Sequence, residues 1–154
     1  MTHSSRPPQS QDLVAITSAS NPQVKALKSL ERKKGRREQN AFLAEGARLI
    51  SEALAHEWEP VTVIFGPDGQ SRPASQELIH QAENKGARPL LVNDRLLGSI
   101  ARKENPQTLL ATFRPKYRPL SELTKQDVAS GTFVGLYQIR DPGNLGTILR
   151  TSDF

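Results

Sequence analysis

The residues best suited to chemistry lie close together near the end of the chain, in residues 141–151, Asp-Pro-Gly-Asn-Leu-Gly-Thr-Ile-Leu-Arg-Thr. Asp141-Pro142-Gly143 predicts a tight turn, and we expect Asn144 to cap the helix that follows it. Arg150 comes six residues after Asn144, so we expect its side chain to reach back along this helix. A planar guanidinium that is always charged suits a phosphate or a developing oxyanion. The spacing alone fits a plain turn with a surface arginine equally well.

A second group of candidates is defined by charge. Residues 24–37 contain seven basic residues against Glu31 alone, a net charge of +6, whereas the whole chain carries +5 and the remainder therefore −1. A basic excess confined to one short segment is typical of a phosphate-binding surface, although a solvated helix face has the same composition. We call residues 24–37 the basic segment; its cations are Lys25, Lys28, Arg32, Lys33, Lys34, Arg36 and Arg37.

The composition excludes several other kinds of site. Cysteine is absent, so neither disulfides nor thiolate metal sites are available, and His3, His56 and His80 lack the spacing of metal ligands. No apolar run approaches the ~18 residues of a membrane span, and the polar start of the chain does not resemble a signal peptide. Hydrophobic residues at 36% and charged residues at 24% suit a globular protein. We therefore expect a cytoplasmic protein without a metal.

Helices and short apolar strands alternate upstream of residues 141–151. Asn21-Pro22 predicts a capped helix start, and Gly35 is expected to end that helix within the basic segment. The helix after Gly46 is expected to bury Leu49, Ile50, Ala53 and Leu54. We also predict strands at 42–44, 61–65, 89–92 and 109–113, helices at 76–85 and 94–100, and a turn-rich loop at 66–73. This alternation predicts an α/β sandwich with a largely parallel sheet.

The pattern breaks after Phe113. Residues 114–131 resemble an interdomain linker with one short helix from Ser121, and residues 132–139 predict a new strand. A strand, a glycine-bearing loop and a helix start form the opening unit of a second α/β domain. One strand and a few turns of helix cannot form a domain, so we expect the sequence to be truncated inside it.

These motifs, in this order, resemble those of the SpoU methyltransferases of the SPOUT superfamily. Asp141-Pro142-x-Asn144-x-Gly146-x-x-x-Arg150-Thr151 is similar to the first signature of that family. The upstream motifs that resemble its substrate-binding domain are Ile16-Thr17-Ser18-x-x-Asn21-Pro22-x-Val24-Lys25, Gly35-Arg36-Arg37-Glu38, Phe42-Leu43-x-Glu45-Gly46-x-Arg48-Leu49 and Asn105-Pro106-Gln107. The resemblance covers roughly residues 16–154.

The resemblance implies a three-layer α/β/α sandwich similar to ribosomal proteins that bind kinked RNA, followed by a trefoil-knot SPOUT domain. We accordingly divide the chain into a disordered lead (1–14), an RNA substrate-binding domain (15–113), a linker (114–131) and the start of a truncated SPOUT domain (132–154). The implied reaction is methyl transfer from S-adenosylmethionine to a ribose 2′-hydroxyl of ribosomal or transfer RNA, by a homodimer joined through the missing domain. The cofactor motifs of the family follow its first signature, so we expect this fragment to bind RNA but to lack the cofactor pocket and activity.

The resemblance also assigns roles to single residues. The catalytic arginine of the first signature falls on Arg150 and its asparagine on Asn144. Because a guanidinium is almost never neutral, we expect Arg150 to bind phosphate and stabilise the developing alkoxide, with Asn144 holding it in place. In the basic segment the expected RNA contacts are Arg36 and Arg37 first, then Lys33 and Lys34, with Lys25 and Lys28 beside them. Trp58, Tyr117 and Tyr137 could stack on bases, but we expect them to pack.

Two other interpretations remain open. One is a non-catalytic RNA-binding protein, similar to kink-recognising ribosomal proteins, in which residues 132–154 are an unrelated tail. Such a module has no reason to carry the motif at 141–151. The other is a nucleotide-binding protein that holds phosphate at Gly143 and Gly146, but it lacks both a lysine after the glycines and a G-x-G-x-x-G pattern.

Overall fold

The computed structural model describes residues 13–101 and 108–152, which fall into two compact units, Met1–Lys116 and Tyr117–Phe154. We call them the first and second units. Most of the predicted disordered lead and the whole Asn105-Pro106-Gln107 motif lie outside the described residues. No helix within the described ranges has the length and apolarity needed to cross a membrane.

A four-stranded mixed sheet forms the middle of the first unit. Its strands are β1 (Phe42–Glu45), β2 (Pro60–Phe65), β3 (Arg88–Leu91) and β4 (Leu109–Phe113), in the order β1-β4-β2-β3. β2 and β3 are parallel, whereas β4 lies between β1 and β2 and is antiparallel to both. The prediction of a largely parallel sheet is therefore wrong for β4. Helical crossovers connect strands that run in one direction, but the apolar composition of β4 contains no information about its direction.

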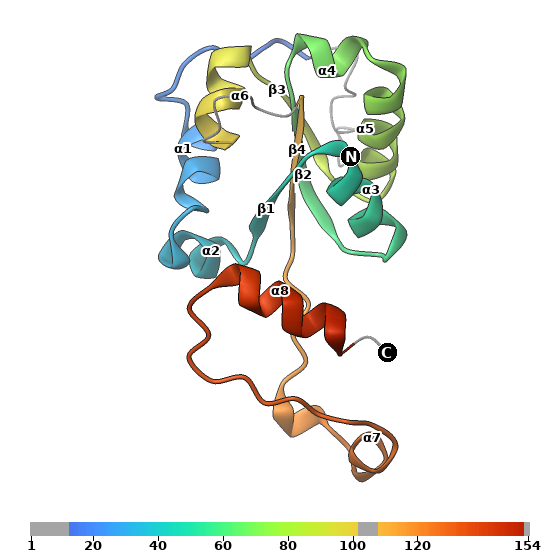
Figure 1. The fold of residues 1–154 in the computed structure, drawn as a ribbon. Helices are drawn as coiled ribbons and strands as arrows, with labels where there is room; N and C mark the ends of the chain where they lie inside the picture. The colour runs from blue at the N-terminus through green and yellow to red at the C-terminus, as the bar shows by residue number, and fades with distance from the viewer. Residues whose placement is uncertain (1–12, 102–107, 153–154) are drawn as a thin grey trace, which may run out of the picture. The chain divides into compact units, whose positions relative to one another are not determined.

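Helices cover both faces of this sheet, so the predicted three-layer α/β/α sandwich is confirmed. α1 (Pro22–Ser29) and α6 (Asp94–Ala101) lie on one side, and α3 (Ala47–Ala55) and α5 (Pro73–Asn84) lie on the other (Figure 1). Because side chains alternate along a strand, Leu110 packs with the α1 and α6 residues, while Leu109 and Phe113 pack with the α3 and α5 residues. Every residue of β4 is buried.

Several helix boundaries and faces differ from the predictions. The helix that begins after Asn21 ends at Ser29, and a separate helix, α2 (Lys33–Gln39), contains Gly35. A short helix, α4 (Pro67–Ser71), occupies the predicted loop. Leu49 is 50% exposed, because α3 turns only Ile50 and Leu54 fully inward. Periodicity locates a helix face only to within about one residue, since neighbouring side chains differ by about 100°.

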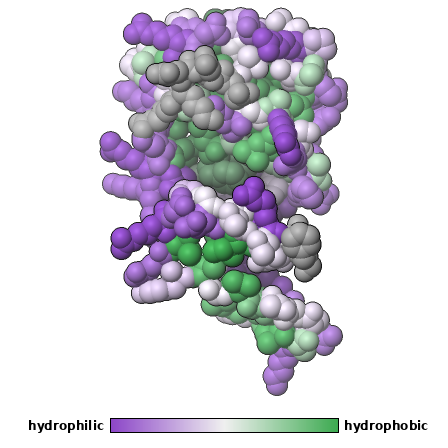
Figure 2. Space-filling model, viewed as in Figure 1, coloured by the Kyte–Doolittle hydropathy of each residue, from purple (hydrophilic) through white to green (hydrophobic). Residues whose placement is uncertain are grey.

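The second unit contains η2 (Leu120–Glu122), α7 (Lys125–Ser130) and α8 (Pro142–Thr151), and none of residues 117–152 is buried. The predicted strand at 132–139 does not form, because a strand needs a hydrogen-bonding neighbour and nothing in this unit supplies one. The apolar side chains of the second unit, among them Phe133, Val134 and Leu149, remain at the surface. Figure 2 shows such hydrophobic surface in the part of the chain that follows β4.

Candidate RNA-binding and catalytic residues

The basic segment is carried by two short helices that pack closely at Gly35. Asn21 accepts a hydrogen bond from the backbone N–H of Gln23 at 2.8 Å, and Pro22 occupies the first turn, so the predicted cap of α1 is confirmed. A Cβ atom on Gly35 would lie 2.1 Å from the carbonyl oxygen of Ser29. Gly35 thus does not end a helix; it lets α2 approach the last turn of α1.

Side chains of α2 also hold the end of α1. Gln39 donates from Nε2 to the carbonyl oxygen of Ala26 at 2.9 Å and to Oγ of Ser29 at 2.7 Å. Arg36 donates from Nη1 to the carbonyl oxygens of Leu30, at 2.9 Å, and Glu31. These carbonyls follow α1, where no helical N–H is available to them. Arg36, predicted as a first RNA contact, therefore has a structural role that the charge pattern did not indicate.

The other cations of the basic segment face solvent. Lys25, Arg32, Lys33, Lys34 and Arg37 are exposed, and Lys28 is partly buried. Lys34 pairs with Glu38 at 3.7 Å, but both side chains are more than half exposed, so the pair contributes little. Hydrophilic side chains cover the edge of the molecule formed by α1 and α2 (Figure 2). The structure thus presents these cations on two helices, α1 and α2, that pack closely at Gly35 and are joined by side-chain hydrogen bonds of Arg36 and Gln39.

The three aromatic candidates divide into two groups. The Trp58 ring packs edge-on against Phe42 with a centroid separation of 5.4 Å, and the Lys116 ammonium lies 5.6 Å from its centre. The expected packing role is confirmed for Trp58. It is wrong for Tyr117 and Tyr137, which are 86% and 84% exposed because the second unit has no core to receive them.

The signature at residues 141–151 forms the start and body of α8. Asp141 caps this helix, since its carboxylate accepts hydrogen bonds from the backbone N–H groups of Gly143 at 3.0 Å and Asn144 at 3.3 Å. Pro142 occupies the first turn. The prediction that Asn144 caps the helix is wrong: the cap falls three residues earlier, because proline can enter a first turn without losing a hydrogen bond.

Asn144 and Arg150 are not brought together. Both are exposed, and neither side chain forms a hydrogen bond or ion pair with the residues that the structure describes. A separation of six residues places them about 120° apart around the helix axis. α8 alone therefore does not assemble a catalytic pair, and Arg150 extends into solvent.

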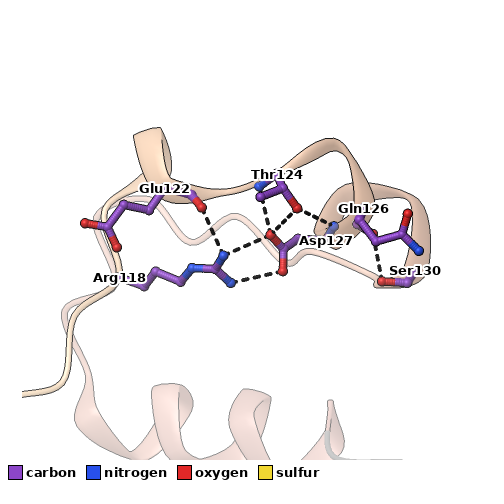
Figure 3. Close-up of polar contacts among 6 residues, drawn as sticks. All are labelled: Arg118, Glu122, Thr124, Gln126, Asp127 and Ser130. Carbon is purple, nitrogen blue, oxygen red and sulfur yellow. Dashed lines mark hydrogen bonds and ion pairs between the residues drawn. The ribbon is translucent and has the colours of Figure 1, made fainter.

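The second unit has one polar cluster that sequence reasoning missed. Arg118 donates from Nη1 and Nη2 to the two carboxylate oxygens of Asp127 at 3.1 and 2.9 Å, and from Nη2 to the carbonyl oxygen of Glu122 at 2.9 Å (Figure 3). Thr124 and Asp127 form a reciprocal capping box at the start of α7. The signal was present in the sequence, as a threonine followed three residues later by an acidic residue. This cluster fixes the turn between η2 and α7.

The Asp127 cluster makes a prediction about pH. The Arg118 guanidinium, and then the hydrogen bonds from Thr124, lower the pKa of Asp127 from 3.8 to about 2. Because the folded pKa lies below the unfolded value, the cluster stabilises this turn fully above pH 3.8 and loses that effect as pH falls through about 2. NMR titration of the Asp127 carboxyl should show this low midpoint. Arg118→Gln should move it towards 3.8, whereas the control Arg140→Gln should not.

No group of three or more histidine, cysteine, aspartate or glutamate side chains in the described ranges could hold a metal ion. A cofactor pocket needs enclosing walls, and residues 117–152 include no buried side chain.

Comparison with known proteins finds relatives among RNA methyltransferases. A family model described as the MRM3-like substrate binding domain matches residues 21–111. The 23S rRNA (guanosine(2553)-2′-O)-methyltransferase RlmP of Bacillus subtilis is 31% identical over 139 residues, 90% of this chain and 50% of its own length. An uncharacterized tRNA/rRNA methyltransferase of Synechocystis is 31% identical over 146 residues, 94% of this chain and 51% of its own length.

One solved structure is similar to this chain in fold and in sequence. The crystal structure of the S-adenosylmethionine-bound rRNA methyltransferase from Sinorhizobium meliloti has a TM-score of 0.75 and 36% identity, covering 91% of this chain and 50% of that one. The chain thus spans about half the length of the relatives that it matches.

Proposed function

The chain belongs to the MRM3-like substrate-binding domain family, and we propose that it is the RNA-binding portion of a ribose 2′-O-methyltransferase of the SpoU type. Its substrate would be ribosomal or transfer RNA, and the whole enzyme would use S-adenosylmethionine and act as a homodimer. In this proposal α1 and α2 bind RNA phosphates, and Arg150 and Asn144 belong to the catalytic site of the whole enzyme.

One observation carries the RNA-binding part of the proposal. The cations of the basic segment are exposed on two helices whose mutual position is fixed by Gly35, Arg36 and Gln39. Ordered cations lose less conformational entropy on binding than cations on a flexible tail. The remainder of the chain is close to neutral, so this surface is the part best suited to a polyanion.

Reversing the charge of two exposed cations tests the proposal. In Lys33→Glu/Arg37→Glu, affinity for structured RNA should fall, and the slope of log affinity against log salt should decrease by about two, one for each lost phosphate contact. We leave Arg36 unchanged because its substitution would also release the end of α1. Fluorescence anisotropy at several salt concentrations measures both quantities.

A matched control separates this surface from total charge. Arg72→Glu/Arg95→Glu removes the same number of cations from exposed positions outside the basic segment. Its salt slope should remain close to that of the unchanged protein. Equal effects of the two double variants would show that RNA responds only to net charge, and the basic segment would then be a solvated helix face.

The cofactor provides a second test. We propose that the 154-residue polypeptide does not hold S-adenosylmethionine by itself, because residues 117–152 have no buried side chain to enclose it. Calorimetric titration should give no saturable heat up to millimolar cofactor, while the same sample still binds RNA. Saturable binding at micromolar cofactor would contradict this part of the proposal.

A further inference from the structure

A groove lies between α1 and the sheet, on the sheet face that α1 and α6 cover, and no residue of α6 lines it. Its volume is about 510 Å³, which falls in the range of small-molecule sites. The wall from α1 and the sheet is apolar, with Leu27, Leu30 and Leu90. The polar side chains that line it are Gln23, Gln39, Thr62, Arg88, Thr112 and Arg114.

The groove forms because the character of one sheet face changes along the strands. Ile64 of β2 and Leu110 of β4 are buried against α1 and α6. Two residues further along the same face are Thr62 and Thr112, which are paired in the β2–β4 register. On β3 the residue two positions away from the buried Leu90, on the same face, is Arg88. Polar side chains thus replace apolar ones in all three strands at this end of the sheet.

Two of these polar groups are placed like ligand-binding groups. Thr112 is 2% exposed and lines the groove, yet its hydroxyl has no hydrogen-bond partner among the described residues. Because this hydroxyl opens into the groove, it is available to form a hydrogen bond with a bound ligand. Arg114 is held in place, donating from Nη1 to the carbonyl oxygens of Gln39 at 2.7 Å and Asn40 at 3.1 Å.

The charge of the groove selects the ligand. Among the described residues, two charged side chains line the groove, Arg88 and Arg114. The groove therefore has no acidic side chain from the described part of the chain. Arg88 is exposed and forms no ion pair there, while Arg114 lies 3.9 Å from the Glu59 carboxylate, which is largely exposed. Guanidinium groups suit a phosphate, the adjoining leucines suit the face of a base, and a hydroxyl suits the polar edge of that base.

We propose that this groove binds one unstacked nucleotide of the RNA, with its phosphate at Arg88 and Arg114 and its base against Leu27, Leu30 and Leu90. The Thr112 hydroxyl donates to or accepts from the edge of that base. This proposal rests on the proposed function, because the nucleotide belongs to the RNA substrate. It adds to the basic segment a site that recognises single-stranded rather than helical RNA.

Binding of a short single-stranded oligoribonucleotide to the 154-residue chain tests the proposal. NMR titration should shift the backbone amides of Thr62, Leu90 and Thr112. Arg88→Gln should lower the affinity about tenfold, since it removes a charged hydrogen bond. The control Arg95→Gln removes the same charge from exposed α6, and should change affinity less than about twofold.

A second variant distinguishes binding from folding. Thr112→Val should leave the thermal midpoint unchanged or raised, because the hydroxyl has no partner to lose, while affinity for the oligonucleotide falls about threefold. Lowered stability with unchanged affinity would instead show that Thr112 is structural, which contradicts the proposal.

The outcomes also separate this proposal from the proposed function. If structured RNA binds the basic segment but the groove amides do not shift, the groove proposal is wrong and the proposed function stands. If no RNA binds at all, both fail. Saturable shifts with free uridine monophosphate, without shifts from the oligonucleotide, would make the groove a mononucleotide site and overturn its assignment to RNA.

Discussion

Replacing Arg150 with alanine should lower kcat by about 10²–10³ in an active methyltransferase that contains this chain. That is the usual cost of removing one preorganised donor to a developing oxyanion. Arg150 is exposed and has no partner among the described residues, so the loss should not arise from unfolding. Single-turnover methylation at saturating RNA measures the rate, and calorimetry should show nearly unchanged cofactor affinity.

Two further variants refine the role of Arg150. Arg150→Lys should restore only part of the rate, because an ammonium keeps the charge but not the planar fork that binds phosphate and alkoxide together. Arg140→Ala removes another exposed arginine of the second unit and serves as the control. A near-normal single-turnover rate with only a raised KM for RNA would show that Arg150 binds substrate without acting on the reaction.

The largest loss of stability from one added methyl group is expected at Gly35. The Cβ of Gly35→Ala would lie 2.1 Å from a backbone oxygen, which no side-chain rotation can relieve, so α1 and α2 must separate. We expect the free energy of unfolding to fall by about 2 kcal/mol, outweighing the roughly 1 kcal/mol that alanine gains over glycine in a helix. Trp58 is the only tryptophan and lies in the first unit, so its fluorescence during urea unfolding reports this unit alone.

Gly146→Ala is the matched control for Gly35→Ala. Both glycines lie within helices, but nothing lies within 4 Å of a Cβ built on Gly146. The Trp58 transition should remain unchanged in this variant. Equal stability of Gly35→Ala and the unchanged protein would show that α2 does not pack on α1 as the structure has it.

Local signals in the sequence predicted much of the first unit. The β4 strand was predicted with both of its ends, since five consecutive residues suited to burial have few alternatives to a covered strand. The cap and first turn of α1 followed from Asn21 and Pro22, whose chemistry acts within two residues. Such features depend on neighbours in the sequence, which a reader of the sequence can see.

Features that depend on distant neighbours could not be predicted in the same way. The direction of β4 depends on β1 and β2, and the role of Gly35 depends on a carbonyl six residues away across a helix junction. The charge pattern predicted Arg36 as an RNA contact, although its side chain reaches from α2 to backbone carbonyls at the end of α1. The groove was missed because Thr62, Arg88 and Thr112 belong to three different strands.

The position of β4 has a consequence for how the protein is made. β1 and β2 do not pair with each other; each pairs with β4, which is the last of the four strands to be synthesised. Until residues 109–113 have been synthesised, β1 and β2 therefore each have an edge without its hydrogen-bonding partner. These unpaired edges are exposed to aggregation or to binding by a chaperone. The four-stranded sheet is completed only when β4 has been synthesised and pairs with both β1 and β2, so we expect the first unit to fold late and in one step.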